Sequence, residues 1–189
     1  HQGGLGDCYF LAGLQSLAHT KPDLLKNAIT DNGDGTYTVR LYKRTGLFGG
    51  KLTQKSVTIN SEFVVYKNTT RNAYARYGDV DNNYEEEMWV RLFEKAYAKL
   101  HGGFDKIDGG FEDAALEALT GESHTMKNFN GFMGIGKMKD ADLKKTVIDQ
   151  TSANEPVNCG TKSQGAIDKH DKKEGHTFAA DNNIVGRHA

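Results

Sequence analysis

Residues 1–17 read HQGGLGDCYFLAGLQSL, and this stretch decides the fold more than any other part of the chain. Three glycines among the first six residues indicate a tight loop. From Cys8 onward, apolar side chains recur at spacings of three and four, which is typical of the inward face of an amphipathic helix. The pattern predicts a buried helix over about residues 8–19 that begins abruptly after the loop.

The position of Cys8 points to a chemical role. The first turn of a helix carries a partial positive charge and unpaired N–H groups, which favour a thiolate, the form of cysteine that attacks a carbonyl. Gln2 lies six positions upstream on the glycine loop, so its amide can fold back and donate to an oxyanion, with the Cys8 N–H as second donor. The structural alternative is a small buried apolar cysteine.

Composition narrows the classes of function. The 189 residues are 37% hydrophobic, enough for one large domain or two small lobes. Lys and Arg total 24 against 25 Asp and Glu, so the net charge of -1 gives no general electrostatic case for nucleic acid. No stretch approaches the roughly 18 apolar residues of a membrane span, and no membrane segment is expected in these residues. A cytoplasmic and a secreted location both stay open.

The rest of the chain shows further regular patterns. A turn at residues 32–35 is followed by alternation at 37–42 and again around 57–59, which predicts a β-hairpin or small sheet. Residues 85–101 carry the strongest helical pattern, closed by two glycines. We also expect helices that begin near Pro22 and over 111–119 and 141–150, and strands near Val157 and Phe178.

The segment from Gln2 to Leu17, Gln-Gly-x-Leu-Gly-Asp-Cys and the apolar run after it, resembles the active-site segment of calpain-type cysteine proteases of the papain-like superfamily. Tyr9 stands where that family usually has tryptophan. Residues 87–100 are similar to the long helix of the family's first lobe, and residues 116–121 (LEALTG) to the segment that closes this lobe. Within the long helix, we expect Trp89 and Tyr97 to serve packing and not chemistry.

The resemblance implies an α+β, papain-like fold with a helical lobe and a partial β-containing lobe. Residues 1–121 would form the first lobe with Cys8, and residues 122–189 an incomplete second lobe with the histidine, divided near residues 121–136. The implied activity is that of a cysteine endopeptidase, a hydrolase that cleaves peptide bonds of proteins or peptides through a thioester. Neither nucleic acid nor a membrane is an expected partner.

A thiolate needs a basic partner, and histidine suits this role near neutral pH. His188 lies in Ile-Val-Gly-Arg-His-Ala, similar to the family's aliphatic-Val-x-x-His-Ala. His176 lies in Gly-His-Thr-Phe-Ala, similar to the family's Gly-His-Ala-Tyr. His188 is preferred, because the Ile-Val pair before it indicates the start of a buried strand, and His176 is the alternative. The remaining candidates are expected to be solvated: His19, His101, His124 and His170.

The family's third catalytic residue is an asparagine in an Asn-Pro-Trp-Gly stretch after the histidine, and the 189 residues do not contain it. We expect these residues alone to be inactive or weak, because an unoriented histidine seldom adopts the productive tautomer and rotamer. One alternative is a catalytically incomplete calpain-like module that binds peptide or protein between the lobes. Another is a different thiol-dependent acyl-transfer enzyme, such as a transglutaminase or deamidase.

Calcium is a further alternative that the resemblance raises, because Glu87 falls on an acidic position that calpain cores use for the metal. Glu85 and Glu86 could add carboxylates, but acids at a helix N-terminus also complement the helix dipole. No cofactor is required on the preferred interpretation, and bacterial relatives of this family need not depend on the metal. Residues 31–35 look like part of a calcium loop, yet no bidentate glutamate follows at the required spacing, which predicts a bare turn.

Overall fold

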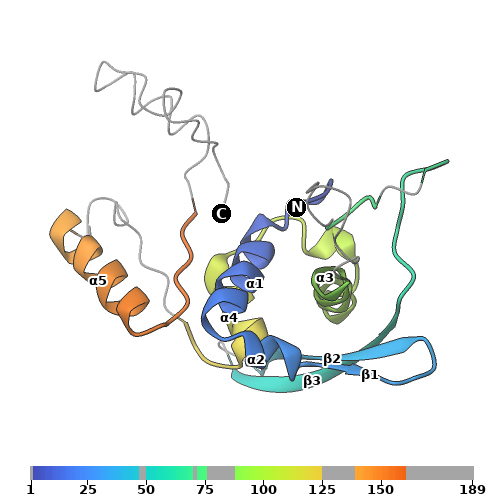
Figure 1. The fold of residues 1–189 in the computed structure, drawn as a ribbon, viewed down its shortest axis with the longest axis horizontal. Helices are drawn as coiled ribbons and strands as arrows, with labels where there is room; N and C mark the ends of the chain where they lie inside the picture. Colours follow the sequence, from blue (N-terminus) through green and yellow to red (C-terminus); the bar gives the residue numbers. More distant parts are fainter. Residues whose placement is uncertain (1, 47–49, 70–71, 76–87, 125–138, 161–189) are drawn as a thin grey trace, which may run out of the picture.

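The computed structural model describes residues 2–46, 50–69, 72–75, 88–124 and 139–160. Within these ranges the fold is α+β, as predicted, with helices packed on a three-stranded antiparallel sheet (Figure 1). The elements in chain order are α1 (Cys8–Thr20), α2 (Pro22–Lys26), β1 (Ile29–Asp31), β2 (Thr36–Thr45), β3 (Lys51–Asn60), α3 (Trp89–His101), the 3-10 helix η1 (Phe104–Lys106), α4 (Glu112–Thr120) and α5 (Asp140–Ser152).

The sheet has the order β1-β2-β3, and its register pairs Thr30 with Thr38 and Val39 with Val57. The predicted hairpin of β2 and β3 is confirmed. The three-residue β1 was missed because it is too short to show alternation. Val39 and Leu41 are fully buried, so the face of the sheet that carries them forms one wall of the core.

The predicted helix after Cys8 is confirmed as α1, and its buried face carries Phe10, Leu14 and Leu17, none more than 1% exposed. The ring of Phe10 stacks on Tyr97 of α3, with centroids 4.1 Å apart. Helices α1, α3 and α4 stand over one side of the sheet in Figure 1. The core therefore lies between α1 and its neighbours, with the N-terminal end of α1 at the edge remote from the sheet.

The shorter helices also follow their sequence signals. Pro22 occupies the first turn of α2, where its missing N–H costs nothing. Helix α4 ends at Gly121, whose φ of 77° is left-handed and which lies against the ring of Tyr42. Helix α5 is set apart in Figure 1, and the chain after it returns to the start of α2, where Lys21 and Glu155 form an ion pair at 2.6 Å.

The strand predicted near Val157 is wrong. Residues 155–160 form no strand, and no strand of the described chain pairs with them. A strand needs a partner for its backbone groups, and a short apolar segment does not supply one. The strand expected near Phe178 lies outside the described residues.

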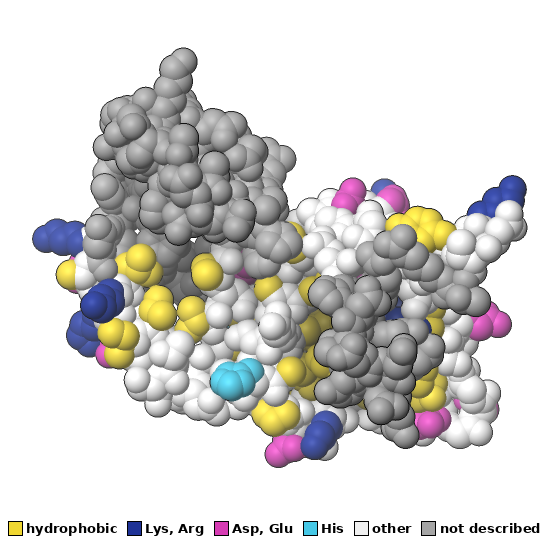
Figure 2. Space-filling view, turned by 45° about the horizontal axis from the view of Figure 1, so that its top comes forward, with side chains coloured by type: hydrophobic (Ala, Val, Ile, Leu, Met, Phe, Trp, Pro, Cys, Tyr) yellow, Lys and Arg dark blue, Asp and Glu magenta, His cyan; other side chains and the backbone are white. Residues whose placement is uncertain are grey.

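The described residues carry both basic and acidic side chains on their surface. On the face drawn in Figure 2, basic and acidic side chains lie mainly near the edge, with several basic ones close together at the left. Across the described ranges, no helix has both the length and the apolar character to cross a membrane.

Candidate active site

The glycine loop that precedes α1 is held from two sides by hydrogen bonds. On one side, the Gly4 N–H donates to the Ala73 carbonyl at 2.8 Å. On the other, the Gly6 N–H donates to Asp108 Oδ1 at 2.7 Å, and the Gly6 carbonyl accepts from the Gly109 N–H at 2.8 Å. Two segments remote in sequence therefore fix the backbone that leads into the helix.

Gly3 shows why this loop needs glycine. A Cβ at this position would lie 2.1 Å from the Tyr74 carbonyl oxygen, well inside the contact distance of two atoms. The backbone of residues 72–75 therefore occupies the space that a side chain would need. The glycines that the sequence indicated as a tight loop allow two stretches of backbone to meet.

Cys8 is the first residue of α1 and is partly exposed, with no disulfide partner. Asp7, the residue before it, is the N-cap of the helix, and its carbonyl accepts from the N–H groups of Phe10 at 2.9 Å and Leu11 at 3.1 Å. The Asp7 side chain forms no cap hydrogen bond, although aspartate is a strong N-cap residue. The Cys8 thiol therefore lies at the positive end of α1, and no aspartate side chain caps this end.

Gln2, the predicted oxyanion donor, is partly buried in the same loop. Its side-chain nitrogen donates to the carbonyl of Leu5 at 2.6 Å, so the amide folds back along the loop toward α1. An amide nitrogen carries two hydrogens and can serve a second acceptor. The oxyanion role of Gln2 stays a prediction.

Two buried acids below the loop were missed by the sequence analysis. Asp7 is fully buried and Glu94 of α3 is 2% exposed, and their side chains contact each other. Both oxygens of Glu94 also accept from the Ala75 N–H at 3.0 Å. Burial, with the charge of Asp7 beside it, raises the pKa of Glu94 to about 9, and burial raises the pKa of Asp7 as well.

Tyr9, which replaces the family's tryptophan, is buried and belongs to the core. Its hydroxyl donates to the Ile107 carbonyl at 3.3 Å, and its ring packs edge-on against Tyr97. The ring also lies so close to Gly110 that a Cβ there would come within 2.3 Å of it. The aromatic position after Cys8 therefore anchors the start of α1 to the loop after η1.

The long-helix residues expected to pack do so. Trp89 meets the ring of Phe93 edge-on, and Tyr97 stacks on Phe10. The LEALTG segment also has a structural explanation, because Glu117 forms a salt bridge with Arg44 of β2, including a 2.8 Å bond from the Arg44 Nε. That bond lowers the pKa of Glu117.

Both candidate catalytic bases, His176 and His188, lie outside the described residues. His19 is exposed, as expected. His101 is half-buried, and its ring lies 4.5 Å from that of Tyr97; burial, with Lys43 nearby, lowers its pKa. His124 bonds through Nε2 to the Thr120 hydroxyl at 2.9 Å. Both rings are partly exposed, and each also contacts a helix residue nearby.

The acidic residues proposed for calcium, Glu85 to Glu87, also lie outside the described residues. In the part of the chain that the structure covers, no three His, Cys, Asp or Glu side chains are grouped to hold a metal ion. A turn follows β1, as predicted: Asp31 Oδ1 accepts from the Gly33 N–H at 2.9 Å, and Asp34 Oδ1 accepts from the Thr36 N–H at 3.0 Å. These carboxylates serve the turn.

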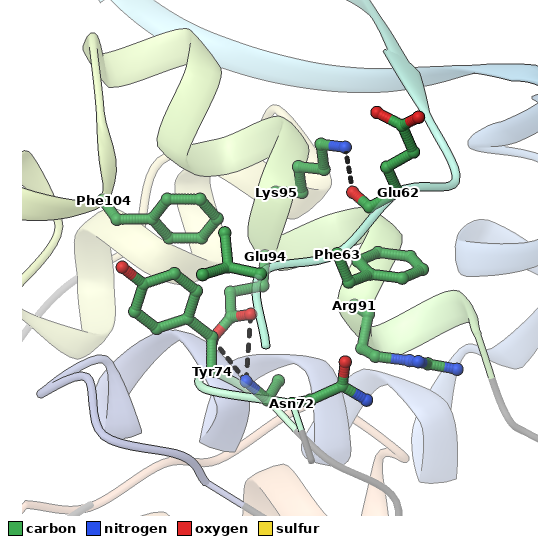
Figure 3. Close-up of a pocket in the computed structure, with 10 residues that line it drawn as sticks. Glu62, Phe63, Asn72, Tyr74, Arg91, Glu94, Lys95 and Phe104 are labelled. Atoms are coloured by element: carbon green, nitrogen blue, oxygen red, sulfur yellow. Dashed lines mark hydrogen bonds between the residues drawn. The ribbon is translucent and has the colours of Figure 1, made fainter. Parts of the chain in front are cut away.

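A small hollow that is open to solvent lies beside Glu94 (Figure 3). The ring of Tyr74 stacks on Phe104 at 4.1 Å on one side, and the Arg91 guanidinium lies 4.6 Å from the centre of the Phe63 ring on the other. Glu94 points between them to the backbone at residue 75. The segment that supports the glycine loop therefore also forms a wall of this hollow.

Comparison with known proteins agrees with this geometry. A family model described as calpain family cysteine protease matches residues 1–189. Calpain clp-4 of Caenorhabditis elegans is 32% identical over 127 residues, which cover 64% of this chain and 16% of that protein. Calpain-9 of Rattus norvegicus is 32% identical over 120 residues, again 64% of this chain and 16% of the relative.

The calpain-type cysteine protease DEK1 of Zea mays is 32% identical over 123 residues, 64% of this chain and 5% of that protein. The matched region thus spans 16% or less of the length of each of these three relatives. The family model nevertheless covers the whole chain. The chain belongs to the calpain family of cysteine proteases.

Proposed function

We propose that this chain carries the nucleophile of a calpain-like cysteine endopeptidase, with Cys8 as the attacking residue. The observation that supports this most directly is the placement of Cys8 as the partly exposed first residue of a buried helix. No side-chain hydrogen bond from Asp7 caps that helix, although the Asp7 carbonyl accepts from the N–H groups of Phe10 and Leu11. Such a helix end favours an anionic sulfur.

The proposed reaction begins when His188 takes the proton of the Cys8 thiol and the sulfur attacks the carbonyl carbon of a peptide bond. The oxyanion that forms accepts hydrogen bonds from the Cys8 N–H and the Gln2 amide. The C–N bond breaks, and the histidine returns the proton to the leaving amine. Water then cleaves the thioester, which releases the acid and restores the thiol. His176 is the alternative base.

In this proposal residues 1–121 form the lobe with the nucleophile and residues 122–189 contribute the histidine from a second lobe. An asparagine beyond the histidine would orient its ring, as in the family. Every step uses side chains and backbone of the protein, and no step passes through calcium. The substrates are proteins or peptides, in line with the protease family.

An alkylation experiment on the full-length protein tests the nucleophile. Cys159 is exposed and unpaired, and serves as the control thiol within the same molecule. We expect iodoacetamide at pH 6 to modify Cys8 at least tenfold faster than Cys159, measured by peptide mass spectrometry. Equal rates for the two cysteines would refute the nucleophile.

Assays of substrate turnover distinguish a protease from a peptide-binding module and from a transglutaminase. Replacing Cys8 by Ser should abolish hydrolysis of a protein substrate such as casein, with the circular dichroism spectrum unchanged. A peptide-binding module would bind such substrates without cleaving them, and a transglutaminase would instead incorporate a primary amine. Either of those results would replace the protease proposal.

A further inference from the structure

The contact between Asp7 and Glu94 poses a problem of charge. Two ionised carboxylates repel each other, and inside a protein that repulsion is poorly screened. Asp7 is fully buried, and neither of its oxygens finds a conventional donor among the described residues. Glu94 is 2% exposed, and its carboxyl group accepts from the Ala75 N–H. If one of the two is a carboxylic acid that donates to the other, the repulsion is removed and Asp7 gains a donor.

The charged groups near Asp7 and Glu94 do not offset the repulsion between the two carboxylates. Asp108, on the loop after η1, adds a further negative charge near Asp7. On α3, the Arg91 guanidinium lies over the Phe63 ring, and Lys95 bonds to the Asn60 carbonyl at 3.0 Å. Among the uncharged groups, the Tyr9 hydroxyl on α1 lies near Asp7.

We infer that Asp7 and Glu94 share one proton, and that this acid pair is a positioning device that holds the start of α1, and with it Cys8, against α3. The inference rests on the proposed function for its link to Cys8. The raised pKa values of both side chains agree with a retained proton at neutral pH. The proton resides mainly on Glu94, which donates to Asp7 and accepts from Ala75.

The pair also explains why Asp7 does not cap α1. An ordinary N-cap aspartate accepts from the helix N–H groups and would place its negative charge beside Cys8 on the side where the oxyanion forms. The hydrogen bond from Glu94 instead holds the Asp7 carboxylate in the core. The first turn of α1 therefore carries no side-chain carboxylate cap beside Cys8.

The hydrogen bond from the Ala75 N–H to Glu94 also links the acid pair to the glycine loop. Residue 75 follows the segment that bonds to Gly4 and occupies the space beside Gly3. Glu94 thus ties α3 both to the residue before Cys8 and to the segment that supports the loop. One protonated side chain joins three parts of the site.

Glu94→Gln is the informative variant, because an amide can donate to Asp7 and accept from Ala75 without a titrating proton. The matched control is Glu117→Gln, since Glu117 is also buried but is ion-paired with Arg44 and has a lowered pKa. Glu94→Leu removes both hydrogen bonds. Urea unfolding of the full-length proteins is measured at intervals from pH 5 to pH 9.

The direction in which stability changes with pH follows from proton linkage. Glu94 keeps its proton in the folded protein up to about pH 9 and loses it near its ordinary value of 4.5 when unfolded. Wild-type stability therefore falls as pH rises through this window, and the folding equilibrium constant of Glu94→Gln relative to wild type should rise by about tenfold per pH unit. The same ratio for Glu117→Gln should stay flat. A flat ratio for Glu94→Gln would overturn the shared proton.

The positioning role has its own readout, the rate of Cys8 alkylation at pH 7. Glu94→Gln should react within about threefold of wild type, a rescue, while folded Glu94→Leu should react at least tenfold more slowly. Unchanged reactivity in Glu94→Leu, or a Gln variant as slow as the Leu variant, would overturn the positioning role. If the pH dependence appears but wild-type Cys8 reacts no faster than Cys159, the shared proton stands and the proposed nucleophile fails.

Discussion

The rings of Phe10 and Tyr97 stack with their centroids 4.1 Å apart and their planes within 8° of parallel. Because Phe10 lies two residues after Cys8, this contact fixes the first turn of α1 on the middle of α3. Phe10 has no exposed surface and Tyr97 only 3%. The place of the cysteine in the molecule therefore depends on the packing of two helices as much as on the loop before it.

Replacing Phe10 by Ala should destabilise the protein by about 3–5 kcal/mol, because it removes a fully buried ring and leaves a cavity between α1 and α3. Urea unfolding gives the change in the free energy of unfolding. Phe111→Ala is the control, since Phe111 is 63% exposed and its loss should cost about 0.5 kcal/mol or less. Equal losses in the two variants would contradict the packing described above.

The sequence predicted these helices because their signals are periodic and local. The three- and four-residue spacing after Cys8 and the strong pattern before Gly102 each describe one face of one helix, and burial on that face follows. The hairpin was predictable in the same way from the alternation around Val39 and Val57. Such patterns do not depend on which element lies opposite.

The acid pair could not be predicted in this way. Asp7, directly before a helix, has the sequence signature of a capping residue, and Glu94, between Phe93 and Lys95, resembles an ordinary charged position on a helix. Their shared site exists only because α3 packs against the start of α1. A signal was present, since Glu94 lies on the same face as Tyr97, but its meaning depends on a tertiary contact.

Replacing Gly3 by Ala should impair the site without removing any functional side chain. The new Cβ would lie 2.1 Å from the Tyr74 carbonyl oxygen, so the loop and residues 72–75 must move apart. Moving reacting groups out of place by about 1 Å can cost about 100-fold in rate. We expect kcat/KM for a peptide substrate to fall by about that factor in the full-length protein, with Cys8 alkylation slowed as well.

Gly13→Ala is the matched control for that change. Gly13 lies within α1, and a Cβ there would meet Leu119 at 3.4 Å and Ala115 at 3.6 Å, which are ordinary contacts. Alanine also favours helix over glycine by about 1 kcal/mol. The variant should keep its activity and be equally or more stable. If both glycine variants lose activity equally, the steric explanation for Gly3 is wrong.

The salt bridge of Glu117 with Arg44 should show a pH dependence on the acid side. Hydrogen bonding to Arg44 lowers the pKa of Glu117 below its ordinary value of 4.5, so its stabilisation is present above that value and is lost as pH falls through the lowered folded pKa. The advantage of wild type over Glu117→Gln in urea unfolding should be constant from pH 6 to 8 and shrink on acidification below about pH 4.5. An advantage unchanged down to pH 3 would contradict this assignment.

Replacing Gln2 by Ala should lower kcat by about 100- to 1000-fold with little change in KM, because an oxyanion donor acts mainly in the transition state. The same hydrolysis assay measures both constants. Gln15→Ala is the control, because Gln15 is an exposed glutamine on α1 and its loss should leave kcat unchanged. A Gln2 variant with kcat within threefold of wild type would contradict the oxyanion role and leave Gln2 a structural role in the loop.

The choice between the two histidines can be made by the same assay. Replacing His188 by Gln should lower kcat by about 100- to 10000-fold, since a side chain that cannot accept and return the proton removes general acid–base catalysis. His176→Gln should retain most of the activity, and each variant serves as the control for the other. If His176→Gln is the inactive variant and His188→Gln is active, the roles are reversed. If both are active, neither histidine is the base, and the proposed Cys-His mechanism fails.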